Sequence, residues 1–564
     1  MLQHLPLAFA LVGLTAFATI VANRTGAPHA IVLVVFGLIL ALAPGLPTVS
    51  LDPELILLLF LPPLLYSSGV AMSWRGFRRN LRPILLLAIG CVLFTAVAVA
   101  AAAHWLFGLP WAVGFVLGAV VSPPDAVAPM AIARRLSVPK RILTVLEGEG
   151  LVNDATALIL FGFALGAVET GGVSLFAAGA KFALVVAGET VWGLLLANVV
   201  LRLRRAVANP QVEITLALLT PFFAFWPPHH FGGSGVIATV AAGLYVSWNG
   251  PRFIAPSTRL QGFFVWGFVV FLIEGVLFLL TGLQAHAAAG SAKDWGWGRL
   301  LVAGAAISAV VALVRFAWVY PATYLPRLWP PLRARDPNPP WRWTFVIAFT
   351  GLRGVVSLAA ALSIPYEIGG KPFPERDIIM FVTFCVILAT LVGQGLTLPW
   401  VIGRLGLAQQ GDAEAHDMKR QEVSARVEGV RAALARLDAL ERDGADGALV
   451  QSLRRRHGDR LAHLEATGDD RIPGSPTADS VGLSFELVTA ERARIGRAYR
   501  DGELDDEARR RVERELDLEE ARLHHAAESA VGAEAHAEAG EGSGDPADPE
   551  EAGAGADRMA SSGA

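Results

Sequence analysis

The chain has 564 residues, of which 54% are hydrophobic and 17% are charged, and its formal net charge is −3. This composition excludes an ordinary soluble domain, in which about 25% of residues are charged, and we expect no nucleic-acid partner. Cys91 and Cys385 both lie in apolar stretches. Neither a disulfide framework nor a thiolate metal site is therefore expected.

Apolar runs long enough to cross a hydrocarbon core of about 30 Å recur along most of the chain. They predict an all-α polytopic membrane protein with about thirteen transmembrane helices. The predicted spans lie near 6–22, 28–44, 53–72, 83–104, 110–133, 142–167, 173–200, 211–227, 232–248, 262–286, 297–320, 342–364 and 376–402.

The composition changes after the last span, and this change predicts three regions. Residues 1–403 are expected to form the transmembrane domain. Residues 404–529 are rich in Arg, Glu, Asp and Ala and predict a cytoplasmic helical regulatory domain, with a passive helical appendage as the alternative. Residues 530–564, rich in Ala, Gly, Glu and Ser, are expected to be disordered.

Apolar side chains repeat every three or four residues in the second region, which predicts amphipathic helices. The repeating residues of the first helix are Val423, Val427, Val430, Leu434 and Leu437, and its expected stop is Gly444. Those of two further helices are Val488, Ile495 and Tyr499, then Val512, Leu516 and Leu523.

Lys and Arg predict the orientation, because cytoplasmic loops carry the excess of positive charge. Basic clusters fall in alternate connections, within residues 75–82, 134–141, 202–205 and 327–342. With an odd number of spans, this pattern places the N-terminus outside the cell membrane and the C-terminal tail in the cytoplasm.

Several ionisable residues fall at the same depth in this arrangement. At about 1.5 Å per residue, Asp125 lies roughly 15 residues into its span, and Asp154 lies roughly 12 residues into the next. Glu274 and Arg353 lie at a similar depth in two other spans. Such residues usually mark ion or proton paths, because leaving a charge in lipid is unfavourable.

Two spans carry helix-breaking sequences at this level. Ser122-Pro123-Pro124-Asp125 removes two backbone donors, and residues 351–354 contain two glycines. If spans 1 to 6 and 8 to 13 are inverted repeats, both breaks fall in the fifth helix of a repeat, as in secondary transporters with crossed broken helices. The alternative is an ordinary proline kink with glycine packing.

Four stretches resemble one family, the monovalent cation/proton antiporters of the sodium/proton exchanger branch. Residues 122–128 are similar to its Ser-Pro-Thr-Asp-Pro-Val-Ala motif, and residues 147–154 to its Glu-Gly-Glu-Ser-Leu-Leu-Asn-Asp helix. Residues 351–357 resemble its Gly-Leu-Arg-Gly-Ala-Val-Ser segment, and residues 61–66 match a further stretch. The resemblance implies a bacterial-type antiporter with a long cytoplasmic tail, which works as a homodimer embedded in lipid.

The chain departs from the family pattern at three positions. Pro124 stands where the family has Thr, Gly150 where it has Ser, and Ser67 where many relatives have Glu. Cation ligation is therefore expected to depend more on Asp125, Asp154, backbone carbonyls such as that of Pro124, and water.

The predicted mechanism follows from the ligands that a hard alkali cation prefers, which are oxygen atoms. Asp125 and Asp154 supply two anionic oxygens for Na⁺, and a proton competes for the same site. The adjacent Asn153 carries no titratable proton. The family resemblance implies that an Asn-Asp pair accompanies electroneutral one-for-one exchange.

Other charged residues receive supporting roles. Glu149 and Arg353 are expected to form a structural ion pair, with Glu274 as the alternative partner of Arg353 or as a proton relay. Glu147 and Glu213 are expected to line an access funnel or simply to reach water. Arg315 is expected to extend along its helix toward the cytoplasm.

The sequence thus predicts a secondary active transporter, not an enzyme, and one without a cofactor. Its expected function is exchange of Na⁺ for H⁺ across the cell membrane, in pH and sodium homeostasis. Two alternatives stay open: a K⁺/H⁺ (or Li⁺/H⁺) antiporter, and a cation channel or sensor that retains the site.

Overall fold

The computed structural model describes residues 5–25, 28–41, 53–172, 175–207, 209–284, 295–444, 446–467 and 487–495, and the single residues 497, 512, 516, 518, 520 and 523. The chain divides into two compact units, residues 1–415 and 416–564. The first unit extends past the composition boundary at 403, because the first turns of the next helix belong to it.

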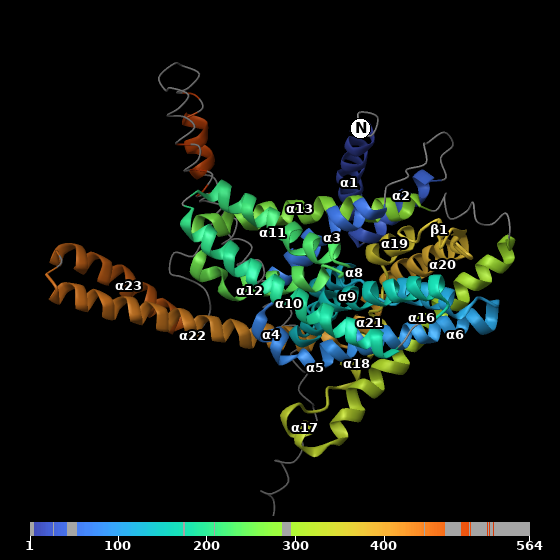
Figure 1. Cartoon of the computed structure of the whole chain (residues 1–564). Helices are drawn as coiled ribbons and strands as arrows, with labels where there is room; N and C mark the ends of the chain where they lie inside the picture. The colour runs from blue at the N-terminus through green and yellow to red at the C-terminus, as the bar shows by residue number, and fades with distance from the viewer. Residues whose placement is uncertain are drawn as a thin grey trace, which may run out of the picture. The chain divides into compact units, whose positions relative to one another are not determined.

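The first unit is a bundle of helices, with α8 and α9 near its middle (Figure 1). Its first half contains α1 (Leu5–Thr25), α2 (His29–Ala41), α3 (Pro53–Ala71), α4 (Trp74–Arg79), α5 (Leu81–Leu85), the π-helix η2 (Leu86–Cys91), α6 (Val92–Phe107), α7 (Trp111–Val121), α8 (Val127–Arg135) and α9 (Lys140–Thr170). The chain continues through α10 (Leu175–Ala206), α11 (Pro210–His230), α12 (Val236–Phe253) and α13 (Pro256–Leu283).

The remainder of this unit follows the same helical pattern. It contains α16 (Trp297–Tyr324), the 3-10 helix η3 (Leu325–Leu328), α17 (Pro330–Arg335), α18 (Trp341–Phe349), α19 (Val355–Leu362), α20 (Arg376–Leu388), η4 (Ala389–Gln394) and α21 (Gly395–Arg404). Two-residue strands β1 (Glu367–Ile368) and β2 (Lys371–Pro372) form one antiparallel hairpin between α19 and α20.

The prediction of an all-α polytopic membrane protein is confirmed. Within the described ranges, six helices are long and apolar enough to cross a membrane, for example those within Lys140–Thr170 and Arg376–Arg404. Shorter apolar helices such as Trp111–Val121 accompany them. The number of thirteen spans and the inverted repeat stay predictions.

Small residues let the helices of this unit approach closely, as is common in membrane proteins. A side chain at Gly118 of α7 would collide with the backbone of Ala96 in α6. Gly37 of α2 and Gly282 of α13 meet backbone to backbone in the same way. The first of these contacts fixes α7, which ends at the first helix break, against α6.

Both predicted helix breaks are present. Between α7 and α8 the chain is not helical at Pro123 and Pro124, where two backbone donors are missing. Between α18 and α19 it is not helical over residues 350–354. Each span is therefore a pair of half-helices whose ends lie inside the bundle.

The helix α22 (Leu407–Arg442) begins in the first unit and continues into the second, where α23 (Gly447–Thr467) returns beside it. The predicted stop is confirmed, since Gly444 adopts φ of 90° just after α22. Val423, Val430 and Leu437 are buried as the periodicity predicted. Arg431 of α22 pairs with Glu465 of α23 at 2.7 Å.

The later part of this unit is described only in places. Val488, Leu516 and Leu523 are buried together, and Val512 lies against them, as predicted. Tyr499 and the residues 530–564, for which disorder was predicted, lie outside the described residues.

Candidate ion-binding site

The two helix breaks contact each other through their backbones. The N–H of Asp125 donates to the carbonyl of Leu352 at 2.6 Å. The N–H of Arg353 donates to Thr390 Oγ1 at 3.0 Å, which ties the second break to η4. The unpaired backbone groups of one break are thus satisfied by the other and by a neighbouring helix, as a buried backbone requires.

Asp125 lies where two half-helices begin. Its Oδ1 accepts a hydrogen bond from the N–H of Val127 at 2.9 Å, in the first turn of α8. Its other oxygen lies against Gly354, the residue that precedes α19, where even a Cβ atom would collide with it. The positive ends of two helix dipoles therefore surround this carboxylate and stabilise negative charge there.

Asn153 and Asp154 come from α9, which passes beside the first break. The amide Nδ2 of Asn153 donates to the carbonyl of Pro124 at 2.6 Å, and both Asn153 and Asp154 are buried. Within the described part of the chain, Asn153 Oδ1 has no hydrogen-bond partner. The amide thus holds α9 to the break through the Pro124 carbonyl.

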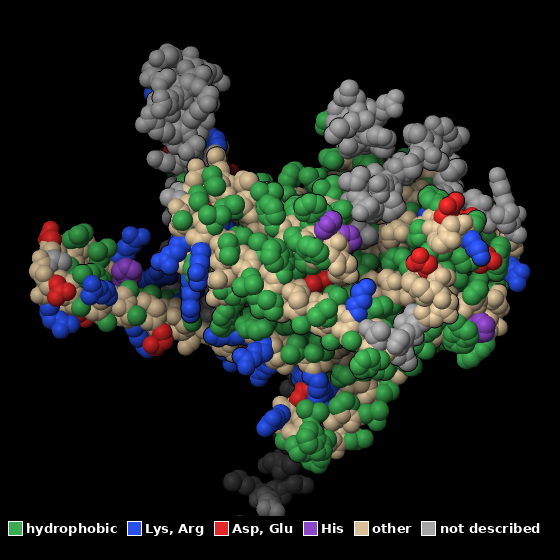
Figure 2. Space-filling view, in the orientation of Figure 1, with side chains coloured by type: hydrophobic (Ala, Val, Ile, Leu, Met, Phe, Trp, Pro, Cys, Tyr) green, Lys and Arg blue, Asp and Glu red, His purple; other side chains and the backbone are tan. Residues whose placement is uncertain are grey.

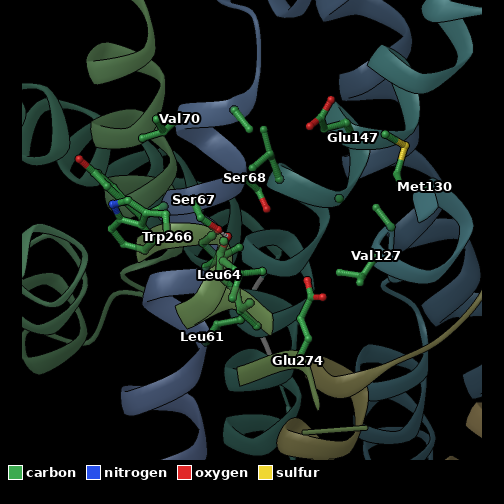
Figure 3. A pocket seen from close by; sticks show the side chains of 18 of the residues that line it. Leu61, Leu64, Ser67, Ser68, Val70, Val127, Met130, Glu147, Trp266 and Glu274 are labelled. Carbon is green, nitrogen blue, oxygen red and sulfur yellow. Dashed lines mark hydrogen bonds between the residues drawn. The ribbon is translucent and has the colours of Figure 1, made fainter. Parts of the chain in front are cut away.

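Asp125 and Asp154 line the same cavity, which has a volume of about 790 Å³. Glu274 of α13 also lines it, and both Asp154 and Glu274 interact electrostatically with Asp125. Figure 3 shows Glu274 at one end of the lining drawn there and Glu147 at the other, with Ser67 and Ser68 in the wall. Carboxylate oxygens gathered in a cavity whose wall is otherwise mainly apolar suit a hard cation or a proton.

Arg353 does not pair with Glu149, so the predicted ion pair is wrong. The Arg353 guanidinium donates to the carbonyls of Val121 at 2.9 Å and Ser122 at 3.3 Å, and also to that of Gly351. These carbonyls are exposed by the helix breaks, and the C-terminal end of α7 carries partial negative charge. Arg353 therefore neutralises helix ends instead of a carboxylate.

Glu149 pairs with Arg315 of α16. Arg315 Nη1 lies 2.5 Å from Oε1 and Nη2 lies 2.8 Å from Oε2, a bidentate arrangement, and both side chains are at most 2% exposed. Arg315 Nε also donates to the carbonyl of Ile347 at 3.1 Å. The expectation that Arg315 extends along its helix toward the cytoplasm is wrong, because its guanidinium faces the bundle and pairs with a buried carboxylate.

The sequence did contain a signal for this pair. Arg315 lies inside an apolar span of α16, and an intramembrane charge implies a partner on another helix. What the sequence lacked was the rotation of α16, which decides whether the side chain faces lipid or the bundle.

The described geometry is a pair of crossed, broken helices with two aspartates at the crossing. A family model described as "Sodium/hydrogen exchanger, transmembrane" matches residues 10–403. This match covers both breaks, α9 and the cavity. The chain belongs to the sodium/hydrogen exchanger family.

Relatives within this exchanger family agree in sequence over long stretches. An uncharacterized Na(+)/H(+) exchanger of Mycobacterium tuberculosis is 35% identical over 536 residues, covering 91% of this chain and 95% of the relative. The Na(+)/H(+) antiporter ApNhaP of Aphanothece halophytica is 33% identical over 423 residues, covering 73% and 76%. A sodium, potassium, lithium and rubidium/H(+) antiporter of Bacillus subtilis is 34% identical over 388 residues, covering 66% and 57%.

A solved structure has the same fold. The sodium proton antiporter MjNhaP1 from Methanocaldococcus jannaschii at pH 8 superimposes with a TM-score of 0.56 at 17% identity, covering 72% of this chain and 98% of that chain. The family assignment and this fold therefore agree.

The other predicted acidic residues of this exchanger lie in different surroundings. Glu147 lines the cavity and pairs with Arg134 at 3.3 Å. Glu213 is buried beside the cavity, 3.9 Å from Arg204 and hydrogen-bonded by Thr258 at 3.1 Å, and it is not among the lining residues. The funnel prediction thus fits the position of Glu147 but not that of Glu213.

Proposed function

We propose that Asp125 and Asp154 form one site at which a monovalent cation, Na⁺ first, and a proton compete. The observation that carries this proposal is the shared cavity: the two carboxylates lie on its wall, and Asp125 is held between the starts of α8 and α19. The Pro124 carbonyl and the waters of the cavity complete the oxygen ligands of the cation.

Coupling follows from the charge of this site. When empty and ionised, it places two like charges in a partly desolvated cavity, which is unfavourable to move through an apolar barrier. A bound cation or proton removes part of that penalty. Only loaded states then change access, so that each ion moved one way is exchanged for the other.

The exchange is proposed to be electroneutral, one cation for one proton. Asn153 supports this stoichiometry, because its amide donates to the Pro124 carbonyl and carries no titratable proton. In liposomes held at imposed membrane potentials, turnover should be the same at each potential. A reversal point that moves with the potential would contradict the proposal.

The cation preference is a separate question. Na⁺ is favoured by the family, and K⁺ is the second candidate, because the printed name of the Bacillus subtilis relative includes potassium. Measuring proton flux at increasing concentrations of Na⁺, K⁺ or Li⁺ in the same vesicles gives the order of cation preference. A large Na⁺ flux without proton movement would instead support a channel.

The C-terminal region is proposed to be cytoplasmic and regulatory, and its start supports this. Glu414 Oε2 accepts from the N–H of Lys140 at 2.9 Å, at the beginning of α9. Trp343 of α18 donates to Gln410 at 2.8 Å. The first turns of α22 thus hold the starts of α9 and α18, which lead to the ion site. A displacement of α22 would therefore shift both helices.

We also propose residence in the cell membrane as a homodimer, acting in pH and sodium homeostasis. Single cysteines placed in α4 or α22 can be labelled chemically in intact cells. This labelling tests which side of the membrane each helix faces. Cross-linking in native membranes tests the dimer.

The experiment that tests the ion site compares Asp154→Asn with the wild type in proteoliposomes containing a pH-sensitive dye. Sodium addition should release protons from wild-type vesicles, and Asp154→Asn should lower the rate at least roughly 100-fold, because one of the two anionic ligands is gone. Asp377→Asn, at an exposed carboxylate in α20, is the matched control and should keep the wild-type rate. Exchange at the wild-type rate in Asp154→Asn would refute the site.

A further inference from the structure

Three arginines from separate helices converge on one aspartate at the end of the bundle where α22 begins. Asp336, just after α17, lies 2.6 Å from Arg141 and 2.6 Å from Arg327, and 3.3 Å from Arg82. Arg82 comes from α5, Arg141 from α9, and Arg327 from η3. We call these four residues the arginine cluster.

The arginine cluster has more positive than negative charge. Three guanidinium groups face one carboxylate, which leaves two positive charges uncompensated inside the cluster. The partial burial of Asp336 would raise its pKa, but the hydrogen bond from Arg141 and the charges of Arg141, Arg327 and Arg82 hold that pKa below its usual range. Asp336 therefore stays ionised and cannot supply further charge.

Arg82 also has hydrogen-bonding capacity to spare. Its Nε, Nη1 and Nη2 atoms are buried and make no hydrogen bond within the part of the chain that the structure describes. Arg141 and Arg327, in contrast, each donate to Asp336. Arg82 Nη2 lies 3.3 Å from Asp336 but makes no hydrogen bond to it, and buried guanidinium donors without hydrogen bonds are unfavourable, so this group points to a further anionic acceptor.

A second cavity adjoins these donors. Its volume is about 50 Å³, room for about three or four water-sized groups. Arg82, Arg141 and Arg327 line it, together with Thr323, Thr344 and Trp343. No residue lines both this cavity and the ion cavity.

The chain next to the lining residues Arg327 and Trp343 exposes apolar and aromatic side chains. Leu325, Leu328, Trp329 and Trp341 are each more than half exposed. Figure 2 shows hydrophobic and charged side chains together on the projection that carries α17. Exposed Trp beside Arg is typical of a surface at the level of lipid headgroups.

We propose that the arginine cluster binds the phosphate of an anionic phospholipid headgroup in the leaflet on the α22 side of the membrane. The planar guanidinium fork matches phosphate oxygens, and the uncompensated charge favours a lipid with net negative charge over a zwitterionic one. The exposed leucines and tryptophans then contact the acyl chains. This site is separate from the exchange reaction and does not depend on it.

The test uses the full-length protein in nanodiscs of phosphatidylcholine with a minor share of phosphatidylglycerol, and counts retained lipid by native mass spectrometry. The wild type should retain phosphatidylglycerol roughly fivefold more than Arg82→Gln, the change expected for one interfacial charge. Arg82→Lys, which keeps the charge, should retain more than Arg82→Gln. Arg79→Gln removes an exposed arginine of α4 outside the arginine cluster and should lower retention less than Arg82→Gln.

Two outcomes would overturn the proposal. Equal retention in the wild type, Arg82→Gln and Arg79→Gln would show that Arg82 does not bind the headgroup. In a parallel melting experiment in detergent, stabilisation of the wild type by inorganic phosphate but not by phosphatidylglycerol would replace the lipid with a soluble phosphate.

Discussion

Replacing Arg315 with Gln leaves the Glu149 carboxylate buried without its cation. The two charged hydrogen bonds measure 2.5 and 2.8 Å, and both side chains are at most 2% exposed. Removing one partner of such a pair costs about 3–5 kcal/mol, because an uncompensated buried charge is left behind. We expect Arg315→Gln to lower the free energy of unfolding by about that amount, and Glu149→Gln to do so similarly.

The double variant lacks both charges and should lose much less than the two single losses added together. We expect a coupling energy of about 2 kcal/mol or more between Glu149 and Arg315. Polar pairs between membrane helices average about 0.6 kcal/mol in such cycles, so the expected value stands clearly above that background.

Equilibrium unfolding in mixed detergent micelles, followed by the fluorescence of the 14 tryptophans, measures each free energy. The matched control is the same cycle between Glu149 and Arg353, whose guanidinium donates to backbone carbonyls. Its coupling should be smaller. The assignment of the pair is refuted if Glu149 couples more strongly to Arg353, or if the Glu149 and Arg315 losses simply add.

Two further predictions test the helix breaks and the arginine cluster. Gly354→Ala should slow exchange at least roughly tenfold, because the added Cβ collides with the Asp125 carboxylate. Gly393→Ala is the control, because its added Cβ enters open space and exchange should stay normal. Equal exchange rates of the two variants in proteoliposomes would contradict the described crossing. Asp336→Asn should lower Tm by the same amount at every pH from 8 to 5, and by less below about pH 4. The reason is that a carboxyl group whose pKa is lowered in the folded state stabilises the fold while it is ionised, and loses this contribution as it is protonated. Asp377→Asn provides the control for general acid effects, and a wild-type advantage over Asp336→Asn that grows as the pH falls would contradict the charge assignment.

The local features that the sequence predicted follow from short-range chemistry. Pro123 and Pro124 have no backbone N–H, so the break before α8 could be placed to within a few residues. Gly444 ended α22 as predicted, because glycine readily takes the positive φ of a helix end. The common depth of Asp125 and Asp154 in the membrane stays a prediction, made from the constant rise of a helix along apolar runs.

The predictions that failed involved pairs of residues far apart in the chain. Arg315 and Glu149 are 166 residues apart, and the carbonyls that Arg353 binds lie up to 232 residues away. A sequence gives the depth of a charge in the membrane but not the direction that it faces. Glu213 was misplaced for the same reason, since its burial against Arg204 depends on how α10 and α11 meet.

The sequence by itself determined that this protein is a helical membrane protein of the exchanger type with two interrupted helices, because hydrophobicity and proline chemistry are local properties. The tertiary structure alone decided which cation neutralises Glu149, which carbonyls Arg353 binds, and that three arginines meet at Asp336. Those contacts depend on the rotation and crossing of whole helices, which side-chain packing over the entire bundle sets and no single segment encodes.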